Sequence, residues 1–350
     1  MTRLAAPRLS ALVILAVLAG PLSACTPSPE ASGTPSPVAT SERPQSTPTP
    51  TPPPPPPPTT VSAPLRGTEM SVADARRPAL SVKIDNHYDA RPQYGIDRAD
   101  IVVEELVEGG LTRYVATWHS DLPAEVGPVR SIRPMDPDIV SPLGGIIAYS
   151  GGRAQFVSMM QKSGLHNAVH GGADDRFMYR TGERRAPHNV ILKAPQLVAA
   201  YDDLAAPKAQ FRYTETGAAP LSGTKSAGID LTFSRVSPRS WTWDQKSSTY
   251  VRSQHGRADT AAGGTRIAAT NVLVLRVSID GRYGDVPKTV LVGSGKGTLS
   301  TGGYAMPVVW SKESRTAPIV LKDAAGSEVP LGIGKTWVEL VPTAGGVAIR

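Results

Sequence analysis

The sequence predicts an α+β protein, in which a mixed α/β N-terminal domain is followed by a mostly antiparallel β C-terminal domain. Three patterns in the 350 residues support this prediction. A proline-rich segment sets residues 1–65 apart from the rest of the chain. Strand and helix patterns then alternate as far as residue 207, and short strand patterns separated by turn signals continue from residue 208 to the end. We therefore expect domains over 66–207 and 208–350.

Residues 1–24 have the pattern of an export signal. Arg3 and Arg8 precede an apolar run that is too short for a transmembrane helix, and small residues follow it. The signal ends in "LSAC", which resembles the lipobox of bacterial lipoproteins, so we expect cleavage before Cys25 and lipidation of its thiol. The alternative is an ordinary cleavage site beside an incidental cysteine. Cys25 is the only cysteine, however, and would then leave an exported protein with a reactive thiol.

The predicted anchor places the protein at the cell membrane, facing the extracytoplasmic side. A diacylglyceryl thioether supplies at least two acyl chains, which are enough for stable anchoring. Residues 25–65 are rich in Pro, Thr and Ser and cannot build a core, so we expect a disordered linker. Its proline run, Pro52–Pro58, favours a semi-rigid spacer that reaches on the order of 100 Å.

Composition excludes several classes of partner and cofactor. The net charge of +7 would suit nucleic acid, but no lysine-rich arm accompanies it and aromatic residues make up only 5%, so we expect no nucleic-acid partner. The polyanions available outside the cytoplasm are lipid headgroups, wall phosphate polymers and peptidoglycan carboxylates. A single cysteine excludes internal disulfides and a cysteine metal cage. We expect neither a cofactor nor a metal.

The first domain begins with a buried strand over "PALSVKIDNH", which ends at Asp85 and Asn86. A short helix over "MDPDIVSPLG", a buried strand over "GIIAYSGG" and helices over "RAQFVSMMQKSG" and "APQLVAAYDDLAA" complete it. In the second domain, we expect strands over "LTFSR", "WTWDQKSSTYVRS", "TNVLVLRVSI", "PKTVLVGSG", "AMPVVWSKES", "APIVLKD" and "KTWVELVP".

A hairpin is predicted in the first domain over "ADIVVEELVEGGLTRYVATWHS", with its turn at Gly109–Gly110. If that turn is two residues long, Leu106 faces Arg113. Glu104 and Glu108 are then diagonal neighbours of Arg113 on the same face of the hairpin.

Polar residues that follow the predicted strands form the candidate site, because α/β folds bind ligands at strand ends. Our candidates for acid–base catalysis are Asp85, Glu104, Glu108 and His188. Our candidates for ligand binding are Asn86, Arg91, Gln93, Arg130, Arg133, Gly151, Gly152, Arg180 and Asn189.

The segment "EVGPVRSIRP" carries two of these candidates, Arg130 and Arg133, just before a predicted helix. A helix N-terminus favours anions, and guanidinium groups bind carboxylate or phosphate with two hydrogen bonds. The glycines of "SGGR" would let backbone N–H groups approach a second oxygen. The alternative is structural: both arginines pair internally with Asp85, Glu104 or Glu108.

Other signals are weaker. His166 and His170 have a spacing that binds zinc on one face of a helix, but no adjacent carboxylate completes a set. His188 and Asp85 could form an acid–base pair, or His188 could be a packed loop residue. "VLVGSGKGT" resembles a phosphate-binding loop only superficially, since Val290 stands where the first glycine is required.

Several motifs together resemble the YerB-like lipoproteins, a bacterial family classed as a domain of unknown function. They are "KIDNH", "ARPQYGIDRADIVVEELVEGGLTRY", "GPVRSIRP", "SGG" and "RAPHN", in that order within residues 78–189. The segments "YVRS", "TNVLVLRV", "WSKES" and "GKTWVELVP" are similar to the second domain of that family. The resemblance implies a two-domain architecture and export as a lipoprotein, but no established reaction or catalytic residues.

Three functions remain open at this point. The first is a membrane-anchored binding module that holds an anionic or glycan ligand, such as an anionic wall polymer or peptidoglycan, at the arginines and amides. The second is a hydrolase or transferase that acts on an envelope polymer, so whether the protein is an enzyme is uncertain. The third is a structural, partner-binding lipoprotein. A binding module requires arginines that the protein leaves unpaired, whereas an enzyme requires a positioned carboxylate or histidine.

Overall fold

The structure, a computed structural model, describes residues 58–214 and 223–350. The predicted signal, Cys25 and most of the predicted linker lie outside the described residues. Strands dominate, and the longest described helix, α2 (Ala154–Gln161), has eight residues. None of the described helices is long and apolar enough to cross a membrane. The C-terminal half is rich in strands, as predicted, while the N-terminal half has shorter helices and more strands than we expected.

The folded part of the chain begins before the predicted boundary at residue 66. β1 (Thr60–Ser62) pairs with β2 (Glu69–Ser71), and the Leu65 side chain between them is fully buried. Arg66 Nε lies 2.7 Å from the buried carboxylate of Asp100. The last residues of the predicted linker therefore belong to the fold. Its polar composition concealed the buried Ala63 and Leu65, which anchor it.

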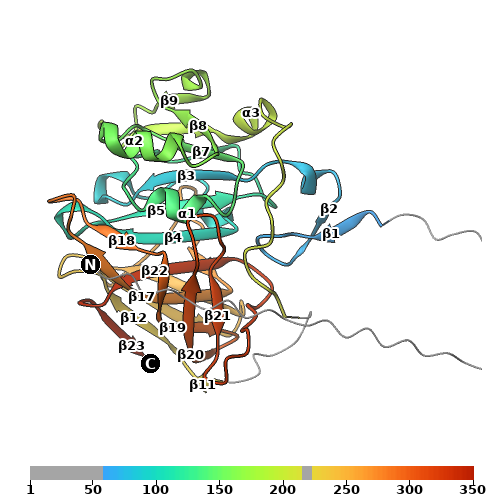
Figure 1. The fold of residues 1–350 in the computed structure, drawn as a ribbon, viewed down its shortest axis with the longest axis vertical. Helices are drawn as coiled ribbons and strands as arrows, with labels where there is room; N and C mark the ends of the chain where they lie inside the picture. The colour runs from blue at the N-terminus through green and yellow to red at the C-terminus, as the bar shows by residue number, and fades with distance from the viewer. Residues whose placement is uncertain (1–57, 215–222) are drawn as a thin grey trace, which may run out of the picture. The chain divides into compact units, whose positions relative to one another are not determined.

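One twelve-stranded sheet contains strands from both sides of the predicted domain boundary. The first half contributes β3 (Leu80–Asp85), β4 (Ile101–Leu106), β5 (Thr112–Trp118), β7 (Ile146–Tyr149) and β8 (His166–Val169). The second half contributes β11 (Thr224–Lys225), β17 (Asn271–Asp280), β18 (Lys288–Val290), β19 (Gly293–Thr301), β20 (Tyr304–Lys312), β21 (Val320–Lys322) and β22 (Thr336–Pro342). β22 lies between β17 and β4 and is parallel to both, so the halves are joined backbone to backbone (Figure 1).

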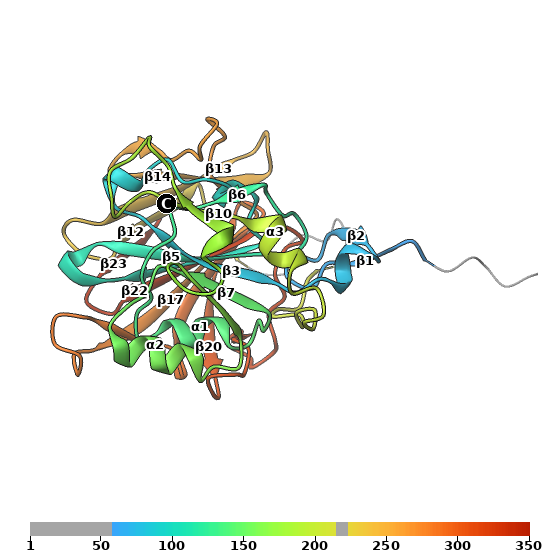
Figure 2. The ribbon, with the colours of Figure 1, turned by 90° about the horizontal axis from the view of Figure 1, so that it is seen from above.

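Other elements cover the two faces of this sheet. One face packs against a six-stranded sheet of β12 (Gly228–Thr232), β13 (Pro238–Asp244), β14 (Thr249–Gln254), β15 (Arg257–Ala258), β16 (Ala268–Ala269) and β23 (Gly346–Ile349). On that side also lie α3 (Ala194–Ala199) and a three-stranded sheet of β6 (Glu125–Val126), β9 (Met178–Arg180) and β10 (Val190–Lys193). The opposite face packs against α1 (Asp136–Val140) and α2, as Figure 2 shows.

The predicted hairpin forms, but its register differs by one residue from our expectation. The connection runs from Val107 to Leu111, so Leu106 pairs with Thr112 and Arg113 pairs with Glu105. Because successive side chains of a strand point to opposite faces, this shift separates Glu104 from Arg113. Glu104 faces the six-stranded sheet, and Arg113 faces the side of α1. Glu104 and Arg113, which the predicted register had placed on one face, therefore lie on opposite faces of the sheet.

Candidate functional site

The candidate site forms where β3 ends and β5 begins. Asp85, the last residue of β3, pairs directly with Arg113 of β5. The segment with the two arginines runs alongside: Asp85 N donates to Pro128 O at 2.9 Å, and Arg130 N donates to Lys83 O at 2.7 Å. The loop after β7 joins it, because Ser150 N donates to Arg130 O at 3.0 Å. The motifs that carry the family resemblance thus meet in space.

Asp85 is the centre of these contacts. Its side chain is only 3% exposed, yet His188 Nδ1 lies 2.6 Å from Oδ2 and Arg130 Nε lies 3.1 Å from the same oxygen. The backbone N–H of His87 donates to Oδ1 at 3.1 Å. Both oxygens therefore have partners, and two of these partners come from segments distant in sequence. The predicted pairing of Asp85 with His188 is present in the structure.

The arginine cluster consists of Arg113, Arg130 and Arg133. Arg133 Nε donates to Glu108 Oε2 at 2.7 Å, so Arg130 and Arg133 are each paired with a carboxylate, as the structural alternative required. Burial raises the pKa of Glu108, but the hydrogen bond from Arg133, a backbone hydrogen bond and the charges of Arg133 and Arg113 together outweigh it, and the pKa lies below its ordinary value.

Arg113 differs from its two neighbours. Its side chain is buried, and Nη1 donates to Ser131 O at 2.8 Å. Among the described residues, no carboxylate oxygen lies within 4.0 Å of its guanidinium. Burial, and next the charge of Arg133, lower the pKa of Arg113 to about 10. Arg113 was not among the site residues predicted from the sequence, because the expected hairpin register paired it with Leu106. Arg113 lies opposite Asp85, and only the pairing of β3 with β5 reveals this.

Two histidine rings lie together beside Asp85. His87 and His188 are stacked, with ring centroids 4.4 Å apart and an angle of 13° between the planes. A carboxylate only accepts hydrogen bonds, so His188 donates Nδ1–H to Asp85 Oδ2, and its second ring nitrogen, Nε2, takes no part in this bond. Burial, and next the nearby His188, lower the pKa of His87. His87 was not among the predicted site residues, although it stands in the motif "KIDNH".

The remaining ligand candidates have structural contacts. Arg180 Nη1 donates to Asn189 Oδ1 at 2.7 Å, and Arg91 Nε lies 3.5 Å from His87 O. A Cβ at Gly152 would lie 3.1 Å from a side-chain carbon of Ile132, so this glycine allows the loop after β7 to pack closely. The neighbouring Gly151 has a φ of +96°, a conformation that glycine adopts readily.

A second polar assembly lies on the other face of the large sheet and contains Glu104, which the sequence had assigned to the site. Glu104 is fully buried, and Arg239 Nε lies 2.9 Å from Oε1, while Arg252 binds Oε2. Glu339 of β22 pairs with Glu104 across the sheet and accepts from Trp241 Nε1 at 2.7 Å. These contacts bind the two sheets together, so Glu104 is structural.

The two carboxyl groups of this assembly, Glu104 and Glu339, differ in pKa. Burial raises the pKa of Glu104, but the charges of Arg252 and Arg239 outweigh it and lower the pKa. Burial, and next the charge of Glu104, raise the pKa of Glu339 well above its ordinary value, so Glu339 is the neutral member of the pair.

Two further ligand candidates belong to the same buried face. Asn86 Nδ2 donates to Thr112 Oγ1 at 2.7 Å and to Gln254 Oε1 at 3.1 Å. Gln93 is 1% exposed, and its Nε2 donates to Asp85 O at 3.1 Å. Both amides thus hold segments of the fold together, and neither side chain is available to an outside ligand.

A third buried group adjoins the arginine cluster. Lys83 Nζ binds Glu105 and lies 2.8 Å from Asp136 Oδ1, and all three side chains are fully buried. Burial, and next Asp136, raise the pKa of Glu105. Asp136 also accepts from the backbone N–H of Arg133, so this triad fixes the start of α1 beside the cluster.

The histidines with zinc spacing do not meet. His166 lies on β8 rather than on a helix, and its Nε2 is 2.8 Å from Asp174 Oδ2. His170 Nδ1 lies 2.6 Å from Asp175 Oδ1 instead. Each ring therefore has its own carboxylate, as expected of two separate surface pairs.

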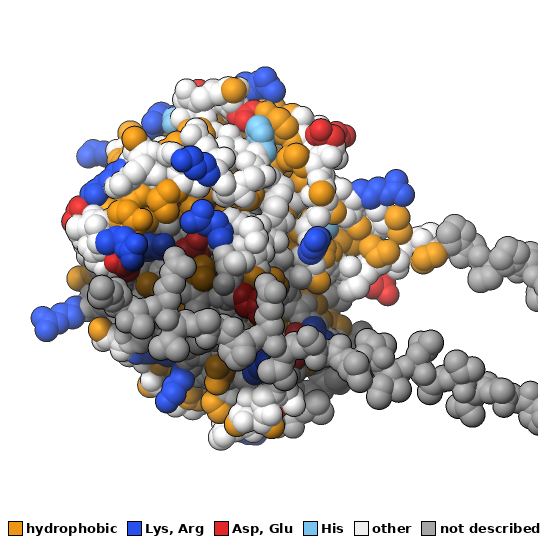
Figure 3. Space-filling model, viewed as in Figure 1, with side chains coloured by type: hydrophobic (Ala, Val, Ile, Leu, Met, Phe, Trp, Pro, Cys, Tyr) orange, Lys and Arg blue, Asp and Glu red, His pale blue; other side chains and the backbone are white. Residues whose placement is uncertain are grey.

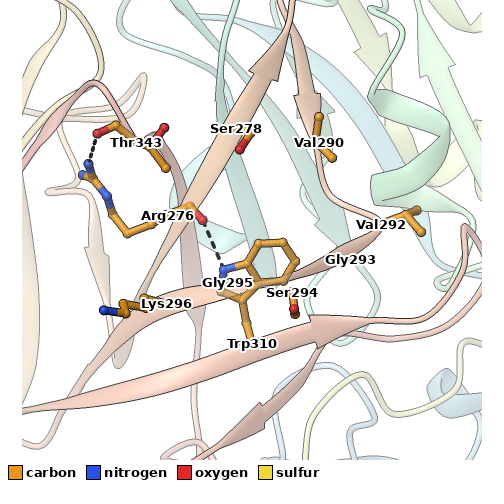
Figure 4. A pocket seen from close by; sticks show the side chains of 10 residues that line it. All are labelled: Arg276, Ser278, Val290, Val292, Gly293, Ser294, Gly295, Lys296, Trp310 and Thr343. Carbon is orange, nitrogen blue, oxygen red and sulfur yellow. Dashed lines mark hydrogen bonds between the residues drawn. The ribbon is translucent and has the colours of Figure 1, made fainter.

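The sequence "GSGK" lines a cavity of about 380 Å³ in the C-terminal half (Figure 4). Gly293 to Lys296 belong to strand β19, so no loop wraps around a phosphate there. Arg276 donates to Thr343 O at 2.7 Å and Gly345 O at 2.8 Å, and in Figure 4 it extends to the same side of the cavity as Lys296. The extended backbone of these residues agrees with the prediction that the likeness to a phosphate-binding loop is superficial.

Basic side chains are dispersed over the face seen in Figure 3, where white and orange atoms separate them. This face carries no continuous basic surface of the kind that tracks a nucleic-acid backbone.

Comparisons with known proteins agree on one family. Residues 65–208 match "Protein of unknown function (DUF3048) N-terminal domain", and residues 229–338 match its C-terminal domain. The Bacillus subtilis (strain 168) protein named "Putative lipoprotein YerB" is 30% identical over 297 residues, which cover 81% of this chain and 86% of that protein. A crystal structure of YerB from Bacillus subtilis is similar in fold, with a TM-score of 0.73 at 24% identity. The matched region covers 82% of this chain and 99% of the YerB chain in that structure.

Proposed function

The chain belongs to the DUF3048 family, and we propose that it is a lipid-anchored extracytoplasmic protein whose N-terminal half binds an anionic ligand of the cell envelope. The family match confirms the resemblance to the YerB-like lipoproteins. The lipobox at Cys25 and the name of the relative support the lipid anchor.

The observation that carries the ligand class is the guanidinium of Arg113. A buried cation without a carboxylate in direct contact is costly, because burial removes its hydration. Here that cation stands beside two more guanidinium groups, Arg130 and Arg133, whose carboxylate partners are already engaged. An anion that enters among the three would restore the missing counter-charge.

Guanidinium groups favour a planar or tetrahedral oxyanion that accepts two hydrogen bonds. The phosphodiester groups of a wall polymer and the carboxylates of peptidoglycan both meet this requirement. Arg130 is the more accessible point of contact, since its side chain is 21% exposed. Arg113 lies deeper and would stabilise the bound oxyanion from beneath.

Calorimetric titration of the full chain in detergent with a soluble poly(glycerol phosphate) tests this function. Arg113→Lys and Arg130→Lys keep the positive charge but lose the planar guanidinium that donates two parallel hydrogen bonds. We therefore expect each to weaken binding about tenfold or more. Arg98→Lys is the matched control, because Arg98 forms an exposed pair with Asp121 away from the cluster. Wild-type affinity in both cluster variants would contradict the proposal, as would the same loss in the control.

A second candidate function, a hydrolase or transferase, is supported by the 2.6 Å pair of His188 and Asp85. A carboxylate that holds Nδ1–H orients the ring and lets Nε2 accept a proton from water or a hydroxyl. Release of a soluble product from an envelope polymer, lost in His188→Gln, would favour this function over binding alone.

A further inference from the structure

We propose that His87, Asp89 and His188 form a binding site for a first-row transition-metal dication such as Zn²⁺. One ligand atom from each residue lies within 4.8 Å of the other two. Two imidazoles and one carboxylate are a ligand set that suits Zn²⁺ and its neighbours in the first row. The residues come from two segments about a hundred positions apart, so their spacing in sequence gave no indication of a metal.

The contact between Asp85 and His188 has the form expected behind a metal ligand. A ligating histidine commonly donates its other ring N–H to a carboxylate, which fixes the tautomer and makes the free nitrogen more basic. His188 Nδ1 makes this bond to Asp85 Oδ2 at 2.6 Å. Nε2 is then the nitrogen available to a cation. Arg130 holds the same carboxylate from another side and keeps it in place.

The present side-chain arrangement is close to a ligating one, but is not identical to it. The two rings are stacked at an angle of 13°, so their lone pairs lie in two nearly parallel planes and do not yet meet at one point. His87 stands before a 3-10 turn, Tyr88–Ala90, with 22% of its side chain exposed, and Asp89 is 49% exposed. Rotation of the His87 ring toward His188 would give up the hydrogen bond that its Nδ1 accepts from the backbone N–H of Asp89 at 3.3 Å.

Three protein ligands leave a tetrahedral ion with one open position. That position would hold water or one oxygen of an anion. Metal binding would also occupy His188 Nε2, so this nitrogen could not then serve as a general base. The metal proposal stands independently of the anion proposal, because it is measured without any envelope polymer.

The test is titration of the full chain with Co²⁺, in detergent and without a polyhistidine tag. We expect one tightly bound Co²⁺ per chain, with visible absorption typical of a tetrahedral site, and displacement by Zn²⁺. His87→Ala and Asp89→Asn should each weaken binding about tenfold or more. Asp85→Asn, which disturbs the carboxylate behind His188, should weaken it about 10–100-fold.

His170→Ala is the matched control, because His170 is a half-buried histidine paired with one aspartate, as is His188. It should bind Co²⁺ as the wild type does. His87→Ala and Asp89→Asn leave the bond between Asp85 and His188 intact, so they decide the question even if variants of that pair unfold. Wild-type affinity in His87→Ala, equal loss in His170→Ala, or no bound Co²⁺ in the wild type would each overturn the proposal.

Discussion

Asp85 positions the N-terminal site more than any other residue. Its two oxygens hold His188, Arg130 and the backbone at His87, and its strand pairing sets Arg113 beside it. A carboxylate in a nearly buried position needs such partners, because without them it would be costly to ionise. The site is therefore assembled around one strand end rather than around the two arginines that were conspicuous in the sequence.

The pair of Arg133 and Glu108 gives a prediction about pH. The pKa of Glu108 lies below its ordinary value of 4.5, so its ionised form stabilises the fold above that pH. This contribution is lost as pH falls from 4.5 through the lowered pKa. Arg133→Ala should cost on the order of 1 kcal/mol at neutral pH, with a discount because Glu108 is partly exposed. The difference from wild type should shrink in acid.

Urea denaturation of the wild type, Arg133→Ala, Glu108→Gln and the double variant measures this coupling. We expect the double variant to lose little more than either single variant, since both remove the same contact. Additive losses, or a difference between wild type and Arg133→Ala that grows in acid, would show that the two side chains act independently.

At the scale of elements, local patterns predicted the individual strands, but not how they pair. Strand β3 and helix α2 lie where the sequence predicted them, because the hydrophobic periodicity of a segment is a local property. The hairpin register was wrong by one residue, since a turn signal does not state the length of the connection. That single shift sent Glu104 to the opposite face.

The site itself was predictable only in part. Arg130, Arg133, Asp85 and His188 were selected from the sequence, and the structure brings them together. Arg113 was missed, because only the pairing of β3 with β5 reveals its position. Long-range contacts of this kind carry no signature in one sequence.

The β1–β2 hairpin gives a prediction about where the folded chain must begin. A chain that starts at residue 58 should melt as the full chain does, because the composition before it cannot build a core. A chain that starts at residue 72 loses the fully buried Leu65 and the partner of Asp100, and should be less stable by about 2–5 kcal/mol. Thermal melts measure the difference. Equal melting temperatures would show that β1 and β2 are dispensable.

At the scale of the whole molecule, the two sequence halves are joined through β22 and through the buried contacts of Glu104. Arg239 and Arg252 come from the six-stranded sheet, while Glu104 and Glu339 come from the large sheet. Removal of one member of a buried ion pair strands the others away from water. The halves should therefore unfold together as one unit.

Glu104→Ala tests this joint. We expect a loss of about 3–5 kcal/mol in the free energy of unfolding, because both arginines lose their shared carboxylate. Glu313→Ala, at an exposed carboxylate, is the control and should change stability by less than about 0.5 kcal/mol. Urea denaturation followed by tryptophan fluorescence measures both. A similar small effect for the two variants would show that the assembly contributes nothing to stability.

The proposed anchor concerns the whole molecule as well. Cys25→Ser should either release the mature protein from membranes or leave the precursor uncleaved, because no thiol remains to be lipidated. Membrane fractionation with detection of the chain size distinguishes these outcomes. If the variant is cleaved normally and still sediments fully with membranes, the lipobox interpretation is wrong.

The most direct test of the proposed binding site is incubation of the full chain with fractionated envelope polymers, scored for both retention and product release. We predict retention of an anionic fraction without release of product. Retention should be lost in Arg130→Ala, while Arg98→Ala should retain as the wild type does. Equal retention by Arg130→Ala and wild type, with unchanged melting temperatures, would contradict the account.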